Sequence, residues 1–385
     1  MKVFIAGGGG YIGTRLSNQL CESGHEVTVL DRFWFGNYLD HRVKQICSGV
    51  LRIKDNALVG YDAVVFLAGL SNDPMADFDP AGNFVENGAA PAYLAYVAKK
   101  CGVPRYVYAS SCSVYGFTDN EEMDEDSQPS PQYPYGIAKL QAEKAIMMLE
   151  DENFRPISIR KGTVGGWSPR MRYDLVVNTM TKYALIEGRI TVNNPNLWRP
   201  LVDIRDVVHA YTLALEINLN TTGIFNICYE NYTIKRIATE IKNKLLHFGF
   251  ATDILINNVT DARNYKATNQ KAKDALGFNP KYTIADSVSD IMENINLSNY
   301  DFFDDSYYNI KTYKKFFVTI GYVAAVVFAQ LWWLLLVAPF VIYPFAWSGH
   351  LFFEKNKPAA WSNPFLAKVC DWLMLRDVLL GRIKL

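Results

Sequence analysis

The chain has 385 residues, half of them hydrophobic, and its 39 basic and 39 acidic residues give a formal net charge of zero. Such a length predicts more than one domain, and the balanced charge argues against a nucleic-acid-binding protein. Six scattered cysteines (Cys21, Cys47, Cys101, Cys112, Cys228 and Cys370) have neither metal nor disulfide spacing, so we expect reduced thiols and no catalytic metal.

The N-terminus carries a nucleotide-binding pattern. An apolar run at residues 2–6 predicts a buried strand, and Gly7, Gly10 and Gly13 follow at intervals of three before a helical pattern. A strand, a glycine turn and a helix N-terminus together direct backbone N–H groups at a pyrophosphate. This pattern predicts a dinucleotide-binding site.

A second predicted strand, at residues 26–30, ends at Asp31. A carboxylate there is placed to accept hydrogen bonds from the adenosine ribose hydroxyls and to repel a 2′-phosphate. This favours NAD over NADP, although Arg32 is a reason for reserve. Farther on, Asp55 and Asn56 are the candidates for contact with adenine.

Tyr135 and Lys139 are four positions apart, so they share one face of a predicted helix. A phenol normally ionises near pH ~10, and an adjacent ammonium favours the phenolate. Tyr135 would thereby become a usable base near neutral pH. Alone, this spacing also fits an ordinary surface pair, and the nucleotide pattern upstream is what favours catalysis.

Over residues 1 to about 300 the chain resembles the extended short-chain dehydrogenase/reductase family, especially its sugar epimerases and dehydratases. The motifs that carry the resemblance occur in family order: the glycine fingerprint, residues 64–69, 110–116, Tyr135 with Lys139, 199–207 and 271–280. The resemblance implies an α/β fold. A Rossmann-type doubly wound parallel sheet would occupy residues 1–160, with 200–230 returning to it, and a smaller α/β substrate-binding region would occupy 161–300.

The resemblance also implies roles for individual residues. Ser111 would hydrogen-bond the substrate oxygen, Tyr135 would be the acid/base, and Lys139 would lower its pKa and hold the nicotinamide ribose; a strand-end hydroxyl capping a turn is the alternative for Ser111. The implied cofactor-binding residues are Gly7, Gly10, Tyr11, Ile12, Gly13, Asp31, Arg32, Leu67, Ala68, Gly69, Asn87, Tyr135, Lys139 and Thr163. The substrate candidates are Ser113, Asn178, Arg199 and Arg263, and for Arg199 a pair with Asp203 or Asp206 is about equally expected.

Two positions after Ser111 argue against one of the reactions known in this family. Dehydratases of this family carry an Asp-Glu pair directly after the triad residue, where this chain has Cys112 and Ser113. Neither side chain can replace a carboxylate, so dehydration is not expected. Epimerisation at C4 of a hexose remains: Tyr135 would take the hydroxyl proton while NAD⁺ takes the hydride, and the hydride would return to the other face of the 4-keto sugar.

The C-terminal part differs from this family. After an expected linker at 301–315, residues 316–353 form a run of 38 residues without Asp, Glu, Lys or Arg. A bilayer span needs about 20 apolar residues, so a membrane-embedded segment is predicted. Basic residues flank both ends, which favours a hairpin or re-entrant segment returning to the cytoplasmic side, and Pro339 and Pro344 are able to break the helix.

Residues 354–385 repeat aromatic and aliphatic side chains at helical spacing among cations, which predicts an amphipathic membrane-surface helix. A helix packed on the reductase domain is the alternative. Residues 349–359 resemble the closing part of a small membrane family of 2-hydroxy-fatty-acid dioxygenases. Of the histidines which that family uses for iron, the matching segment keeps only His350, so the resemblance implies an anchor and no second active site.

A membrane anchor suggests a membrane-bound substrate. The sequence therefore predicts a membrane-associated, NAD-dependent 4-epimerase of a lipid-linked hexose on the cytoplasmic face. The alternatives are an anchored nucleotide-sugar (UDP-hexose) 4-epimerase, a membrane-bound hydroxysteroid or lipid-alcohol dehydrogenase, and a non-catalytic nucleotide-binding subunit. A homodimer is left open.

Overall fold

The computed structural model describes residues 1–118, 121–257 and 264–328, with the backbone alone over 320–328. The chain forms two units, Met1–Phe302 and Phe303–Leu385.

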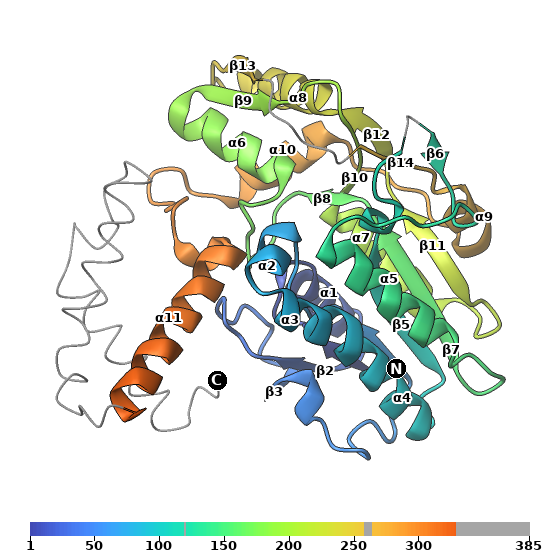
Figure 1. Cartoon of the computed structure of the whole chain (residues 1–385). Helices are drawn as coiled ribbons and strands as arrows, with labels where there is room; N and C mark the ends of the chain where they lie inside the picture. The colour runs from blue at the N-terminus through green and yellow to red at the C-terminus, as the bar shows by residue number, and fades with distance from the viewer. Residues whose placement is uncertain (119–120, 258–263, 329–385) are drawn as a thin grey trace. The chain divides into compact units, whose positions relative to one another are not determined.

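The first unit is built on a seven-stranded sheet whose paired strands are all parallel (Figure 1). The strand order is β11-β7-β5-β4-β1-β2-β3. The strands are β1 Lys2–Ala6, β2 Glu26–Asp31, β3 Lys44–Cys47, β4 Ala63–Phe66, β5 Arg105–Ser111, β7 Arg155–Lys161 and β11 Gly223–Ile227. The central strands are almost wholly buried, as expected for a parallel sheet covered on both faces.

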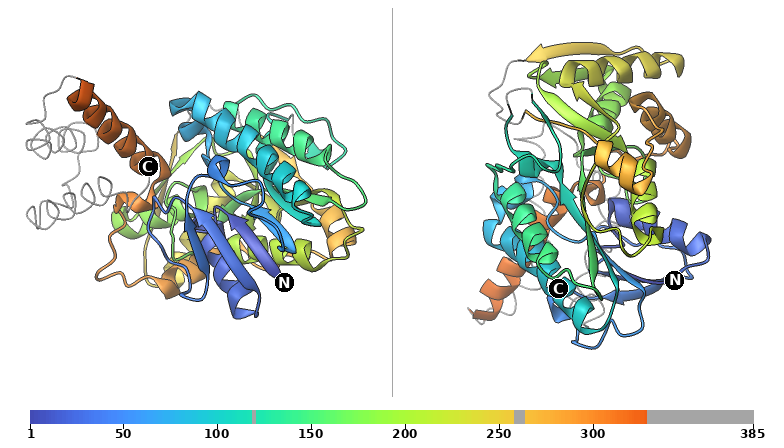
Figure 2. Two further views of the ribbon diagram at one scale, coloured as in Figure 1. Left: turned by 90° about the horizontal axis from the view of Figure 1, so that it is seen from below. Right: turned by 90° about the vertical axis from the view of Figure 1, so that its right-hand side faces the viewer.

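Helices cover both faces of this sheet (Figure 2). One face packs against α4 and α5, where Leu94 and Ile146 join Phe66 and Tyr108 in one core; α1 and α7 pack together on the other. The helices are α1 Tyr11–Glu22, α4 Ala90–Lys100, α5 Pro134–Met147 and α7 Ile204–Glu216. Shorter helices are α2 Asp73–Phe78, α3 Pro80–Asn83, the π-helix η2 Phe84–Ala89, and the 3-10 helices η1 Val50–Arg52 and η3 Cys112–Tyr115. The predicted doubly wound α/β architecture is confirmed.

A smaller α/β region is formed mostly by the chain after β7, together with the earlier strand β6, and has its own apolar core between α6, α8 and α10. Its main sheets have the orders β12-β10-β8 and β13-β9, and β14 pairs with β6. The elements are β6 Glu122–Met123, β8 Thr163–Gly165, α6 Val176–Glu187, β9 Arg189–Asn193, β10 Trp198–Asp203, β12 Glu230–Thr233, α8 Ile234–His247, β13 Asp253–Asn257, β14 Lys266–Ala267, α9 Gln270–Leu276 and α10 Ile284–Asn294. Between them, α7 and β11 return the chain to the large sheet.

The described part of the second unit contains the 3-10 helix η4 Asp305–Tyr307 and helix α11 Asn309–Phe328. Helix α11 thus begins inside the segment that the sequence predicts to be a linker. Among the described residues, no helix is both long and apolar enough to cross a membrane. The remainder of the predicted membrane segment, 329–353, and the predicted surface helix at 354–385 lie outside the described residues.

Candidate functional site

The glycine loop between β1 and α1 fits a dinucleotide closely. Gly7 has a φ of +83°, and a Cβ there would lie 2.3 Å from the Ala68 nitrogen; a Cβ at Gly13 would lie 2.2 Å from the Gly7 carbonyl oxygen. Gly10 precedes α1 without any side-chain cap. The backbone N–H groups at the start of Tyr11–Glu22 therefore remain available to an anion, as pyrophosphate binding requires.

At the end of β2, the Asp31 carboxylate is held by two backbone donors. The Gly9 N–H lies 2.9 Å from Oδ2 and the Phe33 N–H lies 2.8 Å from Oδ1. Burial raises the pKa of this carboxyl group, and the two N–H groups oppose that shift. The carboxylate is thus fixed directly beside the glycine loop, where it can bind the adenosine ribose.

Arg32, the reason for reserve about NADP, is neutralised by a residue that the sequence did not predict. Its Nη2 lies 2.6 Å from Oε1 of Glu86, and its guanidinium packs over the Trp34 ring at 4.8 Å. An arginine already paired with a carboxylate attracts a second anion less strongly. The pair therefore supports NAD over NADP.

Asn87 holds the loop after β4 in place. This loop contains Leu67, Ala68 and Gly69. The Asn87 amide donates to the Leu70 carbonyl at 2.7 Å and to Asn83 Oδ1 at 2.8 Å, and Asn87 is completely buried. A Cβ at Gly69 would lie 2.1 Å from Asn87 Oδ1. In the structure Asn87 therefore shapes the cofactor loop.

Asp55, the adenine candidate, lies elsewhere. It forms an ion pair with Lys100 at 2.7 Å, and Lys100 is the last residue of α4, just before the amino end of β5. The glycine loop and Asp31 lie at the carboxyl ends of their strands. The interpretation of Asp55 as an adenine contact is therefore wrong, because it sits at the opposite edge of the sheet.

The predicted triad residues come together at the carboxyl end of β5. Ser111 is the last residue of β5 and hydrogen-bonds the Tyr135 hydroxyl. Tyr135 lies in the first turn of α5, and the Lys139 Nζ lies one turn later, 5.7 Å from the centroid of its ring. Lys139 also donates to the Ala109 carbonyl at 3.0 Å. Ser111 in addition accepts a hydrogen bond from the Ser113 backbone, so the capping role is present too.

The electrostatics of Tyr135 differ from the expectation. Burial raises its pKa, and the charge of Arg172 is the largest effect in the opposite direction, followed by other contacts including the Ser111 hydrogen bond. The sequence predicted Lys139 for this role, but burial lowers the pKa of Lys139 well below its usual value, and the charge of Lys161 adds to that shift. A buried ammonium loses much of its solvation, so Lys139 is a weak source of positive charge for its neighbour.

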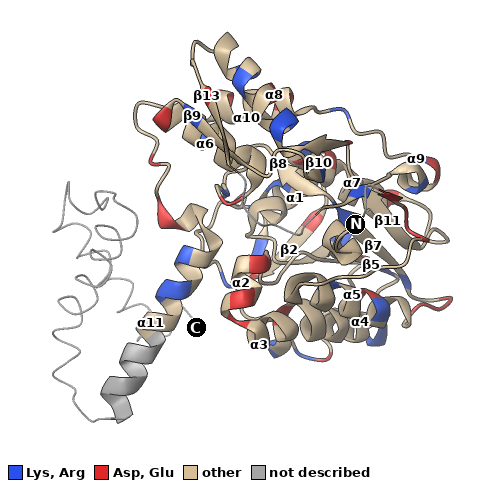
Figure 3. Ribbon diagram, turned by 45° about the horizontal axis from the view of Figure 1, so that its top comes forward, with Lys and Arg blue, Asp and Glu red and all other residues tan. Residues whose placement is uncertain are grey.

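Arg172 was not predicted. Its Nε and Nη2 each lie 2.8 Å from a different carboxylate oxygen of Asp174, and Nη2 also donates to the Ser71 carbonyl at 3.0 Å. Asn72 donates to the same carboxylate at 2.9 Å. Helix α2 follows Asn72 directly in the chain, and Figure 3 shows that it carries acidic residues. One of the acidic residues of α2, Asp73, raises the pKa of Tyr135.

Lys161 was not predicted either. It is the last residue of β7 and stands opposite Ser111 in the register of the two strands. Its Nζ donates to the Ser110 carbonyl at 2.8 Å. Burial, followed by smaller charge effects that include the nearby Arg172, lowers the pKa of Lys161 to about 8. The ammonium form therefore still predominates at neutral pH.

Two predicted ligands are occupied by contacts within the protein. Tyr11 donates to the Gly166 carbonyl at 2.6 Å, and Asn178 donates to the Tyr11 hydroxyl at 3.2 Å and to the Arg172 carbonyl at 2.9 Å. Asn178 Oδ1 accepts from the Gly166 N–H, and Asn178 is fully buried. Asn178, expected to contact substrate, here fastens the loop after β8 (Thr163–Gly165) onto α1.

The other substrate candidates have different surroundings. The Ser113 hydroxyl lies 3.0 Å from that of Ser111, directly at the triad. Arg199, in β10, donates to the Trp198 carbonyl at 2.7 Å and packs over the Tyr265 ring at 5.6 Å. Arg263 lies outside the described residues.

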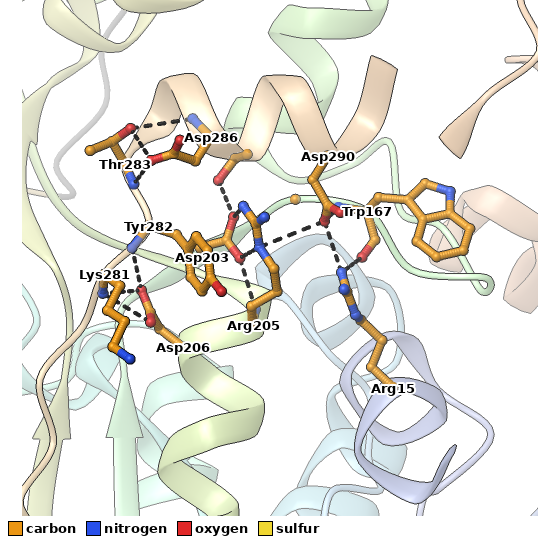
Figure 4. Close-up of polar contacts among 12 residues, drawn as sticks. Arg15, Trp167, Asp203, Arg205, Asp206, Lys281, Tyr282, Thr283, Asp286 and Asp290 are labelled. Carbon is orange, nitrogen blue, oxygen red and sulfur yellow. Dashed lines mark hydrogen bonds and ion pairs between the residues drawn. The ribbon is translucent and has the colours of Figure 1, made fainter. Parts of the chain in front are cut away.

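Asp203 and Asp206, the alternative partners for Arg199, have other roles. Asp203 forms an ion pair with Arg205 and accepts from Ser287, and Asp206 accepts the backbone N–H groups of residues 281 and 282 (Figure 4). These contacts join α7 to the segment leading into α10. The two acids are therefore structural.

Arg15 links the two regions across the site. From α1 it donates to the Trp167 carbonyl at 2.6 Å and to Asp290 of α10 at 2.8 Å (Figure 4). The loop after β8 is thereby fixed against the nucleotide-binding helix.

Family comparison agrees with this arrangement. Residues 3–228, more than half of the chain, match the NAD dependent epimerase/dehydratase family. The chain belongs to this family. Residues 298–383 separately match the family described as 2-hydroxy-palmitic acid dioxygenase Mpo1-like, the same part of the chain in which the sequence resembles 2-hydroxy-fatty-acid dioxygenases.

The chain is also similar to individual epimerases of known sequence. A UDP-glucose 4-epimerase of Corynebacterium glutamicum is 25% identical, covering 74% of this chain and 92% of the relative. UDP-glucose 4-epimerase 3 of Oryza sativa is 28% identical, covering 75% and 88%.

Solved structures share the fold. A UDP-glucose 4-epimerase of Thermotoga maritima gives a TM-score of 0.69 at 23% identity, covering 77% of this chain and 100% of that one. The UDP-glucuronic acid 4-epimerase of Bacillus cereus, bound to UDP-glucuronic acid and NAD, gives 0.67 at 22% identity with the same coverages. The protein is an NAD-dependent epimerase, and its cofactor is NAD.

Proposed function

We propose that this protein is a nucleotide-sugar 4-epimerase that acts on a UDP-linked hexose. The observation that carries the proposal is the meeting of Ser111, Tyr135 and Lys139 beside a glycine loop shaped for NAD. The relatives named above are UDP-glucose 4-epimerases and are covered over almost their whole length. The positions after Ser111 are Cys112 and Ser113, which leaves no carboxylate pair for dehydration.

The geometry assigns a task to each side chain. NAD, when bound, would supply the acceptor for the hydride of C4 and the donor that returns this hydride to the opposite face of the sugar. Tyr135 removes the proton from the C4 hydroxyl and later restores it, and Ser111 hydrogen-bonds the same oxygen. The Arg172 charge and the Ser111 hydrogen bond both favour the phenolate against the effect of burial.

Lys139 holds the nicotinamide ribose while its own position is fixed by the Ala109 carbonyl. Asp31 binds the adenosine ribose at the far end of the cofactor. Because the hydride leaves and returns within one catalytic cycle, a single NAD can serve many turnovers. Retention of the cofactor distinguishes an epimerase from a lipid-alcohol dehydrogenase, which exchanges NAD each time.

A lipid-linked hexose is the second candidate substrate. The observation that favours it is the charge-free run at 316–353, which would bring the catalytic unit to a membrane surface. The named relatives act on nucleotide sugars, so we place the lipid-linked sugar second.

We also propose that the segment after residue 315 attaches the enzyme to the cytoplasmic face of a membrane. The supporting observations are the charge-free run and the basic residues on both sides of it. A chain truncated after residue 306 should lose sedimentation with lipid vesicles while the full chain keeps it. Sedimentation of the truncated chain with vesicles would refute the anchor.

The deciding experiment offers the purified enzyme UDP-glucose, UDP-glucuronate and a glucosyl diacylglycerol separately, without added NAD. Products are identified by mass spectrometry and sugar analysis. Conversion of a UDP-sugar to its C4 epimer, with NAD still bound, supports the proposal. Conversion of the glycolipid alone would replace it with the lipid-linked substrate, and accumulation of an oxidised product would indicate a dehydrogenase.

A further inference from the structure

Lys161 is a cation placed beside the triad without a carboxylate partner among the described residues. It stands opposite Ser111 across the β5–β7 pair, and one of its three ammonium N–H groups donates to the Ser110 carbonyl at 2.8 Å. No other described residue accepts from it. The side chain is partly buried at the carboxyl end of β7.

The charged and titratable groups that act on Lys161 do not neutralise it. Arg172 is itself a cation, Lys139 is a basic group that cannot supply a negative charge, and Cys112 carries a thiol whose pKa is raised by burial to about 12. Asp174, the acid that pairs with Arg172, is already held by both Nε and Nη2 of that arginine. A partly buried cation without a partner has lost solvation that no counter-charge replaces, so an anion that arrives with the substrate would be stabilised here.

We propose that Lys161 selects an acidic sugar by pairing with a carboxylate on C5 of the hexose, so that the preferred substrate is a nucleotide-linked hexuronate. This inference rests on the proposed 4-epimerase function, because it uses the sugar orientation that the triad imposes. Lys161 would then be a specificity-determining residue next to the reacting carbon.

The sugar ring leaves few choices for the anion. Ser111 and Tyr135 would bind the C4 oxygen, so the substituents nearest to them are those on C3 and C5. The C3 substituent is a neutral hydroxyl. The C5 substituent is a hydroxymethyl group in a hexose and a carboxylate in a hexuronate. The diphosphate is attached to C1, across the ring from C4, and is therefore poorly placed to pair with Lys161.

The test compares kcat/KM for UDP-glucuronate and UDP-glucose in the wild-type enzyme and in Lys161→Met. We expect the wild type to prefer UDP-glucuronate, and Lys161→Met to lower the ratio of the two values by about 10- to 100-fold, the range for a lost hydrogen bond to a charged group. Lys161→Arg should keep most of the preference, because it restores the cation.

Lys99→Met is the matched control. Lys99 also donates to a backbone carbonyl, that of Leu149 at 2.6 Å, but its ammonium is paired with Asp151. Its substitution should leave the substrate ratio unchanged. Bound NAD and the thermal midpoint of each variant show that the fold is intact.

Two results would overturn the inference: a wild-type preference for UDP-glucose, or an equal loss on both substrates in Lys161→Met. If neither sugar is epimerised, the proposed function fails, and calorimetric binding of the two nucleotide sugars still decides the role of Lys161. Equal affinities in that case would refute the carboxylate pair, and tighter binding of UDP-glucuronate that Lys161→Met removes would uphold it.

Discussion

Asp31→Asn tests the adenosine end of the site. The substitution keeps the shape of the side chain and removes its charge. Hydrogen bonds to charged groups contribute about 1.5–3 kcal/mol and neutral ones about 0.5–1.5 kcal/mol, so weakening one or two ribose contacts should cost about 1–3 kcal/mol. That corresponds to an NAD affinity about 5- to 150-fold weaker.

The assay is calorimetric titration of NAD and NADP into enzyme stripped of its cofactor, together with the NAD content of the purified variant. The affinity for NADP should fall less than the affinity for NAD, because the substitution removes the charge that repels a 2′-phosphate. Asp62→Asn is the control, because Asp62 also accepts a backbone N–H, that of Lys2 at 2.6 Å, but at the amino end of the sheet. Unchanged NAD affinity in Asp31→Asn would refute the assignment.

Three further predictions follow from the structure. Tyr135→Phe should lower kcat by about 10²- to 10⁴-fold without loss of bound NAD, and a kcat near wild type would exclude Tyr135 as the acid/base. Glu143→Gln removes the counter-charge of the buried Arg160 guanidinium, which lies 2.5 Å from Glu143 Oε1. In urea denaturation, this variant should have a free energy of unfolding lower by about 3–5 kcal/mol. The control is Glu240→Gln, at a more exposed ion pair, which should lower the free energy of unfolding by less than about 1 kcal/mol. Because the pKa of Lys161 lies at about 8, kcat/KM for UDP-glucuronate should fall above that pH as the ammonium is lost; a flat profile to pH 9 would contradict the pairing.

The parts of the site that the sequence predicts well are those formed by neighbours in the chain. The glycine loop needs only a strand, three spaced glycines and a helix, and the Tyr135–Lys139 pair needs only one turn of helix. Both are local arrangements, and the structure contains them as expected. The α/β fold with a parallel sheet was implied by the resemblance to the extended short-chain dehydrogenase/reductase family, and the structure confirms it.

The missed residues meet the site only through tertiary structure. Lys161 reaches Ser111 because β7 pairs with β5, and Arg172 acts on Tyr135 from a loop in the other region. Glu86 neutralises Arg32 from an element 54 residues away. A signal that could have marked Lys161 is a charged residue at the end of a short apolar run, but that pattern gives no partner for it. Asn178 shows the converse, since it was a candidate for contact with the substrate and its side chain makes buried contacts that hold a loop.

The carboxyl edge of the sheet carries an acidic residue at β2 and a basic residue at β7. Following the strand order from β2 to β7, the edge presents Asp31, then the glycine loop, then Ser111, and finally Lys161. The acidic end suits a ribose without a 2′-phosphate, and the basic end suits a sugar with an anionic substituent. A cofactor laid along this edge with its adenosine at Asp31 brings its nicotinamide toward Ser111 and Tyr135. In this order Lys161 lies next to Ser111, and by our proposal its charge selects among sugars while Asp31 selects the cofactor.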